Sequence, residues 1–255
     1  MRTISVINQK GGVAKTTTAS AIGAGLLLRG QRVLFVDLDA QGNLGYSLRA
    51  EASDRNALTV LQRPKTAESA IQHLAQGDII PSTPNMAGAD LAITQTGKEY
   101  RLREALEGIQ GKYDYCVIDT PPALGIATIN ALTASQGIVI PCQADIYSIQ
   151  GLAQLSSTID AVRKYCNPQL QILGILLTRY NKRSIIRRDV AETLAEVAQH
   201  LNTKLFDTRI RECTALVEAQ ARRQSIYQYS PRSNATADYK ALVDEILNEN
   251  GKEAN

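Results

Sequence analysis

Short apolar runs alternate with longer amphipathic stretches along the 255-residue chain. The run TISVIN (3–8) is β-branched and apolar on both faces, as in a strand buried inside a parallel sheet. The stretch that follows the next loop, 15–29, is rich in Ala and Leu and stops before Gly30, as helices commonly do. The alternation predicts strands over 3–8, 32–39, 78–82, 114–120, 137–142, 171–178 and 204–208. It predicts helices over 15–29, 97–109, 125–135, 148–165, 185–201, 212–223 and 235–249.

Strands that alternate with helices of this length form right-handed βαβ units. We therefore expect an α/β fold, in which helices cover both faces of a mostly parallel, twisted sheet. No repeat, low-complexity linker or change of composition divides the sequence, which predicts a single domain over residues 1–255. Residues 50–75 have the least regular pattern and are expected to form a loop with a helix.

The composition narrows the class of protein. A hydrophobic fraction of 44% with 21% charged residues is typical of soluble globular proteins. No apolar run approaches the ~18 residues that a membrane span needs, and the first residues do not resemble a secretory signal. The four cysteines are widely spaced and the chain has only two histidines. This pattern indicates reduced thiols in a cytoplasmic protein and disfavours a metal site built from Cys or His.

The loop between the first predicted strand and helix reads INQKGGVAKTTTAS (7–20). It does not match the standard phosphate-loop pattern G-x-x-x-x-G-K-[ST], because Gln9 and Ala14 occupy the two glycine positions. Backbone N–H groups at the start of a helix nevertheless attract an anion, and the helix dipole adds to this. The pair Gly11-Gly12 permits close approach of a phosphate. Lys15 can reach the β- and γ-phosphates, and the Thr16 hydroxyl can bind Mg²⁺.

The run K-G-G-x-x-K-T-T resembles the deviant Walker A loop of the ParA/MinD superfamily of P-loop ATPases. The usual stretch there is N-Q-K-G-G-V-G-K-T-T, from which only Ala14 departs. The resemblance implies ATP and Mg²⁺ as ligands and a catalytic role for Lys10, which reaches across a dimer interface to the phosphates of the partner's nucleotide. The residues that it assigns to the nucleotide are Lys10, Gly11, Gly12, Val13, Ala14, Lys15, Thr16 and Thr17. A glycine-rich turn with incidental lysines is the disfavoured alternative.

Two further predicted strands end in aspartate, at the edge where an open α/β sheet binds its ligand. In FVDLDAQGN, Asp37 and Asp39 lie on the same side of the strand. Asp39 resembles the aspartate that orients and polarises the attacking water, and Asp37 would lie deeper, towards the Mg²⁺ shell. In YCVIDTPPALG, Asp119 resembles the Walker B aspartate that holds Mg²⁺ through water, and Gly125 helps to shape a segment that senses the γ-phosphate. One aspartate at a strand end is more often a cap or turn residue. Asp39 and Asp119 together, in this order after the loop, are a more specific sign of a nucleotide site.

Other blocks extend the resemblance from Ile4 to Tyr239. In LLTRYNKR (176–183), Asn181 would hydrogen-bond the adenine base, although an Asn after a strand is usually a turn residue. The stretches 210–219 and 229–239 resemble the C-terminal blocks of small ParA proteins.

The net charge of +3 is distributed unevenly. Residues 161–235 carry 13 Lys and Arg against 6 Asp and Glu, a local balance of +7. Such a segment is either the solvated face of surface helices or a surface that binds a polyanion. Under the resemblance, Arg232 matches a DNA-contacting position, and Lys204 matches one less closely. Arg187, Arg188, Arg222 and Arg223 are candidates from charge clustering alone.

The branch of the superfamily is indicated by the tail and by the cysteines. The tail has an apolar stripe formed by Tyr239, Leu242, Val243, Ile246 and Leu247. The stripe predicts a helix packed on the domain. The polar face of this helix is acidic and would be repelled by anionic lipid, so we expect no membrane binding. Nitrogenase-type reductases of the superfamily bind a metal cluster through cysteines that follow the two aspartate-bearing strands. The cysteines of this chain are not at those positions, which disfavours electron transfer. The first predicted strand begins at residue 3, as in short ParA proteins without an operator-binding domain.

We therefore expect a short, Soj-like ParA partition ATPase that is cytoplasmic and nucleoid-associated, with slow basal turnover. The resemblance implies a homodimer in the ATP-bound state, non-specific binding to duplex DNA and a ParB-like centromere-binding partner. A MinD-like ATPase that positions a membrane or surface assembly is the main alternative, and a small-molecule ligase or synthase on the same fold is a third.

Overall fold

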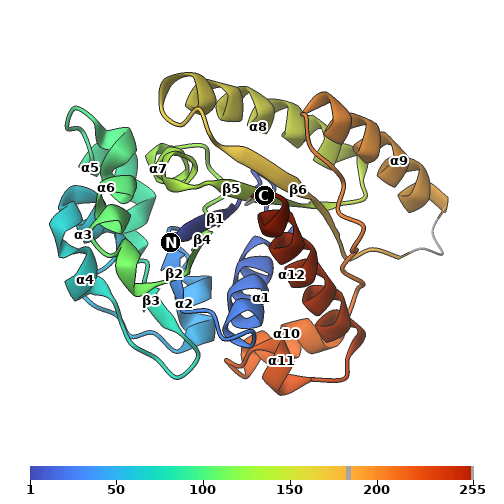
Figure 1. Ribbon diagram of the computed structural model, residues 1–255, viewed down its shortest axis with the longest axis horizontal. Helices are drawn as coiled ribbons and strands as arrows, with labels where there is room; N and C mark the ends of the chain where they lie inside the picture. Colours follow the sequence, from blue (N-terminus) through green and yellow to red (C-terminus); the bar gives the residue numbers. More distant parts are fainter. Residues whose placement is uncertain (182–184, 254–255) are drawn as a thin grey trace.

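Six parallel strands form one sheet in the order β3-β2-β4-β1-β5-β6. The computed structural model describes residues 1–181 and 185–253 (Figure 1). The strands are β1 (Arg2–Val6), β2 (Val33–Asp37), β3 (Asp78–Ile80), β4 (Tyr115–Asp119), β5 (Gly137–Gln143) and β6 (Gln171–Thr178). All of them lie within or next to predicted strands, so the expected α/β fold with a parallel sheet is confirmed.

Helices pack on both faces of this sheet (Figure 1). The α-helices are α1 (Lys15–Leu27), α2 (Asn43–Leu48), α3 (Ala57–Gln62), α4 (Ala67–Ala70), α5 (Ala89–Ala92), α6 (Arg101–Glu107), α7 (Ile126–Ala134), α8 (Ile146–Tyr165), α9 (Ile185–His200), α10 (Thr214–Ala221), α11 (Ile226–Tyr229) and α12 (Asn234–Glu253). Short 3₁₀ helices cover Pro64–Thr66, Pro84–Gly88, Lys98–Tyr100 and Gln110–Lys112. The sequence did not predict α2, α5 or α11, because four to six residues are too few to show a helical period.

The strands are apolar on both faces because each face is covered. In β2, Phe35 points to the layer formed by α1 and α12, whereas Leu34 and Val36 point to the layer formed by α3, α6 and α7. All three side chains are fully buried. This arrangement is the physical reason for the continuous apolar runs in the sequence.

Helix α12 packs on the domain, as predicted from the apolar stripe of the tail, and its neighbour there is α1 (Figure 1). Tyr239, Leu242 and Ile246 are fully buried in the core, and the Tyr239 hydroxyl lies 3.2 Å from the hydroxyl of Thr18. The Arg29 side chain joins the two helices on the outside through Asp244. The apolar face of the tail is therefore covered by the chain itself.

The strand predicted over 204–208 is wrong. The segment makes a single bridge to β6, between Ile175 and Leu205. The N–H of Phe206 still donates to the carbonyl of Ile175 in β6 at 2.9 Å. The N–H groups of Asp207 and Thr208, which follow, donate instead to the Glu245 carboxylate on α12 at 3.2 and 3.0 Å. The pairing with β6 thus ends after one bridge, and a side chain of α12 accepts the N–H groups beyond it.

The order of the strands sets the place of the functional site. Strand β1 lies between β4 and β5, and β2 lies on the other side of β4. In this register Asp119 at the end of β4 pairs with both Val6 and Asp37. The loop after β1 and the two predicted carboxylates consequently meet at one edge of the sheet. Within the described residues, no helix is both long and apolar enough to pass through a membrane.

Candidate active site

The loop from Ile7 to Ala14 connects β1 to α1. Gly12 and Ala14 both have left-handed backbone conformations, with φ of 74° and 70°. Glycine adopts this conformation readily, but for Ala14 it costs about 1 kcal/mol. A Cβ atom built on Gly11 or Gly12 would meet no other atom of the described chain within 4 Å. The loop therefore has a strained backbone with free space beside its glycines, at the start of α1. Phosphate-binding loops have this form.

Three polar side chains hold this loop in place. The Asn8 amide donates to the carbonyl of Pro141 at 2.7 Å, and the Gln143 amide donates to the carbonyl of Gly12 at 3.0 Å. The Thr178 hydroxyl, at the end of β6, donates to the carbonyl of Val13 at 3.1 Å. Strands β5 and β6 thereby fix the loop before any ligand binds, and this support was not predicted from the sequence.

Lys15 is the first residue of α1, and only 8% of it is exposed. Its ammonium group donates to the carbonyl of Lys10, on the other side of the two loop glycines, at 3.1 Å. Burial lowers the pKa of Lys15, and the negative charges of Asp119 and Asp39 oppose this change. The structure therefore brings the predicted phosphate-binding lysine and the two predicted carboxylates into one electrostatic environment.

Asp119 ends β4 and is fully buried. Within the described part of the chain, neither of its carboxylate oxygens accepts a hydrogen bond of ordinary geometry, although the Thr16 hydroxyl lies beside it. Burial and the nearby Asp37 raise the pKa of Asp119 well above its usual value. A buried carboxylate without a donor, next to a hydroxyl, fits a bound cation.

The chemistry of these donors matches magnesium. No cluster of three or more His, Cys, Asp or Glu side chains suited to a metal occurs among the described residues. Mg²⁺ is usually bound by one or two carboxylates together with waters and substrate phosphates, so such a cluster is not required. Asp119 and Thr16 therefore fit the predicted Mg²⁺ site.

Asp37 is fully buried at the end of β2, and its carboxylate organises the following turn. One oxygen accepts the N–H of Asp39 at 3.1 Å, and the other accepts the N–H of Gly45 in α2 at 2.9 Å. Burial raises the pKa of Asp37 to about 7. Because both oxygens already have backbone donors, a direct role for Asp37 as a magnesium ligand stays a prediction.

The turn that Asp37 organises presents Asp39, which is partly exposed. One Asp39 oxygen accepts the N–H of Gln41 at 3.1 Å, and its carbonyl accepts the N–H of Gly42 at 2.9 Å. The carboxylate thus has a fixed position with a face left open beside Lys15. The assignment of Asp39 to water activation stays a prediction that this position supports.

Lys10 points away from its own loop. Its ammonium group contacts the Asp145 carboxylate at 2.6 Å and lies 5.8 Å from the centre of the Tyr147 ring. Asp145 also caps the start of α8, where it accepts the N–H of Ser148 at 3.0 Å. Burial works in the opposite direction, but Lys10 and Ser148 hold the pKa of Asp145 below its usual value. Sequence reasoning missed this partner, although an Asp before a helix is a recognisable capping signal.

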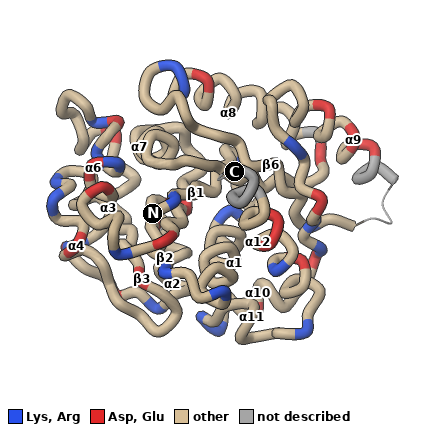
Figure 2. The backbone as a smooth tube through the Cα atoms, viewed as in Figure 1, with Lys and Arg blue, Asp and Glu red and all other residues tan. Residues whose placement is uncertain are grey.

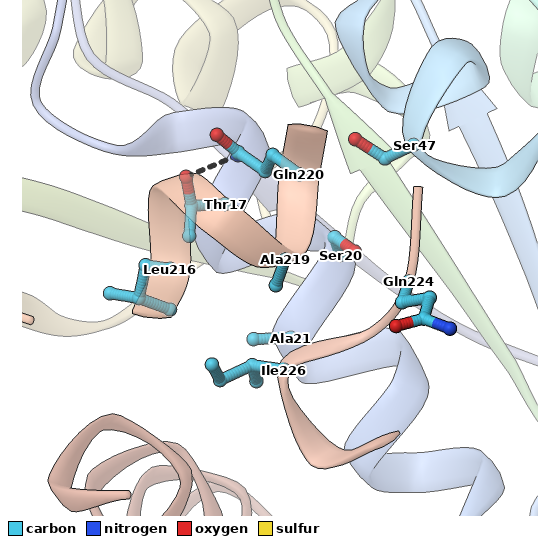
Figure 3. Close-up of a pocket in the computed structure, with 9 residues that line it drawn as sticks. All are labelled: Thr17, Ser20, Ala21, Ser47, Leu216, Ala219, Gln220, Gln224 and Ile226. Carbon is cyan, nitrogen blue, oxygen red and sulfur yellow. Dashed lines mark hydrogen bonds between the residues drawn. The ribbon is translucent and has the colours of Figure 1, made fainter. Parts of the chain in front are cut away.

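Two further predicted ligands of the nucleotide are Thr17 and Asn181. The Thr17 hydroxyl accepts a hydrogen bond from the Gln220 amide of α10 at 2.8 Å, beside a small cavity (Figure 3). Its side chain therefore faces α10, and a contact with phosphate would come from its backbone. Asn181 is exposed after β6, where the N–H of Tyr180 donates to Ile210. Its contact with adenine stays a prediction.

The basic residues of 161–235 have varied surroundings. Arg232 is exposed just before α12. The Lys204 ammonium lies 3.7 Å from the Glu245 carboxylate. The Arg223 guanidinium stacks on the Tyr46 ring at 4.6 Å, whereas Arg222 is exposed at the end of α10. Arg187 and Arg188 lie outside the residues whose side chains the structure describes.

Comparison with known proteins decides the family. The sequence model of a family described as an AAA domain matches residues 1–172. The sporulation initiation inhibitor protein Soj of Bacillus subtilis is 39% identical, over 95% of this chain and 97% of its own. The chromosome-partitioning ATPase Soj of Thermus thermophilus is also 39% identical, over 97% of this chain and 96% of its own. The chain belongs to the Soj/ParA family of chromosome-partitioning ATPases. The predicted family and ATPase activity are thereby confirmed.

A solved structure extends this likeness to the whole fold. A protein from Mycobacterium smegmatis described as a cobyrinic acid a,c-diamide synthase, with a bound ATP analogue and magnesium, is 33% identical to this Soj/ParA chain. The match covers 97% of this chain and 94% of that one, with a TM-score of 0.83. The predicted P-loop fold is therefore confirmed.

Proposed function

We propose that this Soj/ParA ATPase segregates DNA by an ATP-dependent switch. In the proposed cycle, two ATP-bound subunits form a dimer that binds duplex DNA without sequence preference. A ParB-like centromere-binding partner then stimulates hydrolysis and returns the protein to monomers. The observation that carries the proposal is the opposite orientation of two lysines of one loop. Lys15 points inward to its own phosphate site, and Lys10 points outward to Asp145.

ATP and Mg²⁺ are the ligands of the site, as the sequence predicts. The loop N–H groups and Lys15 would hold the phosphates, since both favour an anion at the start of α1. Asp119 and Thr16 would hold the metal. When bound there, Mg²⁺ would supply positive charge next to the phosphate oxygens.

Hydrolysis needs a water molecule held in line with the γ-phosphate. Asp39 has a fixed backbone and a partly exposed carboxylate on the loop side, so we assign it to this task. Burial lowers the pKa of Lys15, and the negative charges of Asp119 and Asp39 oppose this change. The Lys15 ammonium group would bind the negative charge of the phosphates. Slow basal turnover is expected, because a partner must complete this arrangement.

Dimerisation requires Lys10 to change partners. In the single chain its ammonium group is neutralised by Asp145. Two loops that face each other would let each Lys10 exchange this carboxylate for the phosphates of the other subunit's nucleotide. Phosphates carry more negative charge than one carboxylate and give stronger charge-assisted hydrogen bonds. Bound ATP thus becomes part of the interface.

The M. smegmatis structure suggests a second candidate function, amidation of a small molecule. The likeness over 97% of this chain favours it. Partition is favoured more strongly, because the two Soj proteins share 39% of their residues with this chain. The two candidates differ in what would stimulate ATP turnover, since partition needs DNA and a partner protein whereas a synthase needs cobyrinic acid.

The test is DNA binding as a function of nucleotide. Biolayer interferometry with two unrelated duplexes of equal length should show binding in ATP with Mg²⁺ and little binding in ADP or without nucleotide. Non-specific binding should weaken steeply with salt, because it depends on contacts with phosphates. Equal binding in ATP and ADP, or a strong preference for one duplex, would overturn the proposed switch.

A further inference from the structure

Helix α7 begins directly after the segment that follows Asp119, and its first turn lacks a capping side chain of its own. The residue in the capping position is Gly125. The first N–H groups of any helix need acceptors from outside the helix. In most helices a Ser, Thr, Asp or Asn in the capping position supplies one.

Asp90, on the short helix α5, supplies the acceptor from 36 residues away along the chain. One of its carboxylate oxygens accepts the N–H of Ile126 at 2.8 Å. A Cβ atom on Gly125 would lie only 2.4 Å from the other oxygen of Asp90. A residue with a Cβ atom at position 125 would therefore force the Asp90 carboxylate to move.

The opposite end of the segment is fixed as well. The buried Thr120 hydroxyl donates to the carbonyl of Val6 in β1 at 2.8 Å. Within α7, the Asn130 amide donates to the carbonyl of Lys98 at 2.8 Å and accepts from the N–H of Leu102 at 2.9 Å. The residues 121–124 thus form a short span between two anchors, one on β1 and one on α5.

We propose that Asp90 is a positioning residue for ATP hydrolysis. By capping α7, it determines where the helix begins and so where the span after Asp119 meets the γ-phosphate of ATP. It acts through Ile126 and Gly125, without touching the nucleotide. The inference rests on the proposed hydrolysis site and deepens it, but it does not depend on DNA binding or on the partner.

Three variants test the cap. Asp90→Ala should lower kcat about five-fold, because the first turn of α7 loses the acceptor that fixes its position. The affinity for ATP should change by less than about two-fold, since the loop and Lys15 are untouched. Asp90→Asn should restore most of the activity, because its amide oxygen can still accept the N–H of Ile126. Leu91→Ala is the matched control, since Leu91 is 87% exposed on the same turn and should leave kcat unchanged.

Hydrogen exchange gives a second readout that a general loss of stability would not produce. Exchange of the first amides of α7 should speed up in Asp90→Ala and stay normal in the Asn and Leu91 variants, while α8 exchanges as before. The pair Asp90 and Gly125 also allows a double-mutant cycle. Gly125→Ala should lower kcat in the natural protein and have little further effect beside Asp90→Ala, because the opposing carboxylate is gone.

The inference is overturned if Asp90→Ala keeps the kcat and the α7 exchange of the unmodified protein. It is also overturned if kcat and nucleotide affinity fall together in both the Ala and Asn variants. A protein that hydrolyses ATP with the expected Asp90 dependence but ignores DNA would contradict the proposed function alone.

Discussion

The carboxyl edge of the sheet and the basic segment 161–235 both carry many charged side chains, but among the residues that the structure describes only those of the edge are brought together. Lys15, Asp39 and Asp119 come from three separate segments and share one environment. In the basic segment, Arg211 is 2.6 Å from Asp238 and Lys204 is 3.7 Å from Glu245. Lys and Arg positions there are spread over several elements, with acidic positions between them (Figure 2).

The difference follows from what fixes each set of residues. At the edge, the backbone fixes the positions of the charged side chains. The register of the sheet places the ends of β1, β2 and β4 side by side, so the residues at and just after these ends lie close together. In the basic segment, several described side chains contact neighbours from other elements, such as Arg211 with Asp238 and Arg223 with Tyr46. A local sum of +7 therefore overstates the free positive charge of this region.

The largest expected effect tests whether Lys15 and Lys10 have different roles, with Lys15 alone binding the nucleotide of its own subunit. Lys15→Ala should weaken ATP binding about 100-fold, because a charge-assisted bond to phosphate is worth up to about 3 kcal/mol. Lys10→Ala should bind ATP almost normally, since Lys10 faces Asp145. Titration with a fluorescent ATP analogue measures both variants. Equal losses in the two would show that both lysines serve the same nucleotide.

The second prediction concerns the buried carboxylates at the edge. The pKa of Asp37 is raised to about 7 by burial, so the folded protein holds a proton that the unfolded chain has released above about pH 4. The free energy of unfolding should therefore fall as the pH rises from 5 to 7, by up to about 1.4 kcal/mol for each pH unit. Urea unfolding of the nucleotide-free protein at several pH values measures this.

Asp37→Asn is the control for this pH dependence. The variant cannot titrate at residue 37, so the difference between the two proteins should grow with pH in favour of the Asn variant. A difference that does not change between pH 5 and 7 would contradict the assignment.

The third prediction tests the basic segment. Arg232→Ala should weaken binding to all duplexes alike and reduce the slope of log K against log[salt] by about one unit per subunit. Lys204→Ala should reduce the slope less, because Lys204 already pairs with Glu245. Salt titrations of ATP-dependent DNA binding compare the two variants. A larger effect of Lys204, or a loss confined to one sequence, would show that the charges are arranged differently.

The smallest expected effect concerns the backbone of the loop. Ala14→Gly should stabilise the nucleotide-free protein by about 1 kcal/mol, because glycine relieves the left-handed conformation at φ 70°. Gly12→Ala, at φ 74°, should destabilise it by a similar amount. Thermal unfolding measures both. A destabilised Ala14→Gly protein would mean that the alanine methyl group makes favourable contacts that outweigh the strain.

The same contrast explains how much the sequence could predict. Strands β1, β2 and β4, the phosphate loop and Asp119 follow from local patterns and from the rule that parallel strands end at one edge. Contacts between distant side chains carry no such local signal. Lys10 meets Asp145, Asp90 caps α7, and Glu245 accepts two N–H groups at the end of the predicted strand over 204–208. Each depends on which surfaces meet after folding.

The central claim is that ATP joins two subunits through Lys10, and light scattering with ATP and Mg²⁺ tests it most directly. The unmodified protein should double in mass with ATP and stay monomeric with ADP. Asp39→Ala should stay dimeric for much longer, because loss of a water-orienting carboxylate slows hydrolysis at least about 100-fold. Lys10→Ala should stay monomeric while still binding ATP. An unchanged mass with ATP, or a Lys10→Ala protein that dimerises normally, would contradict the account.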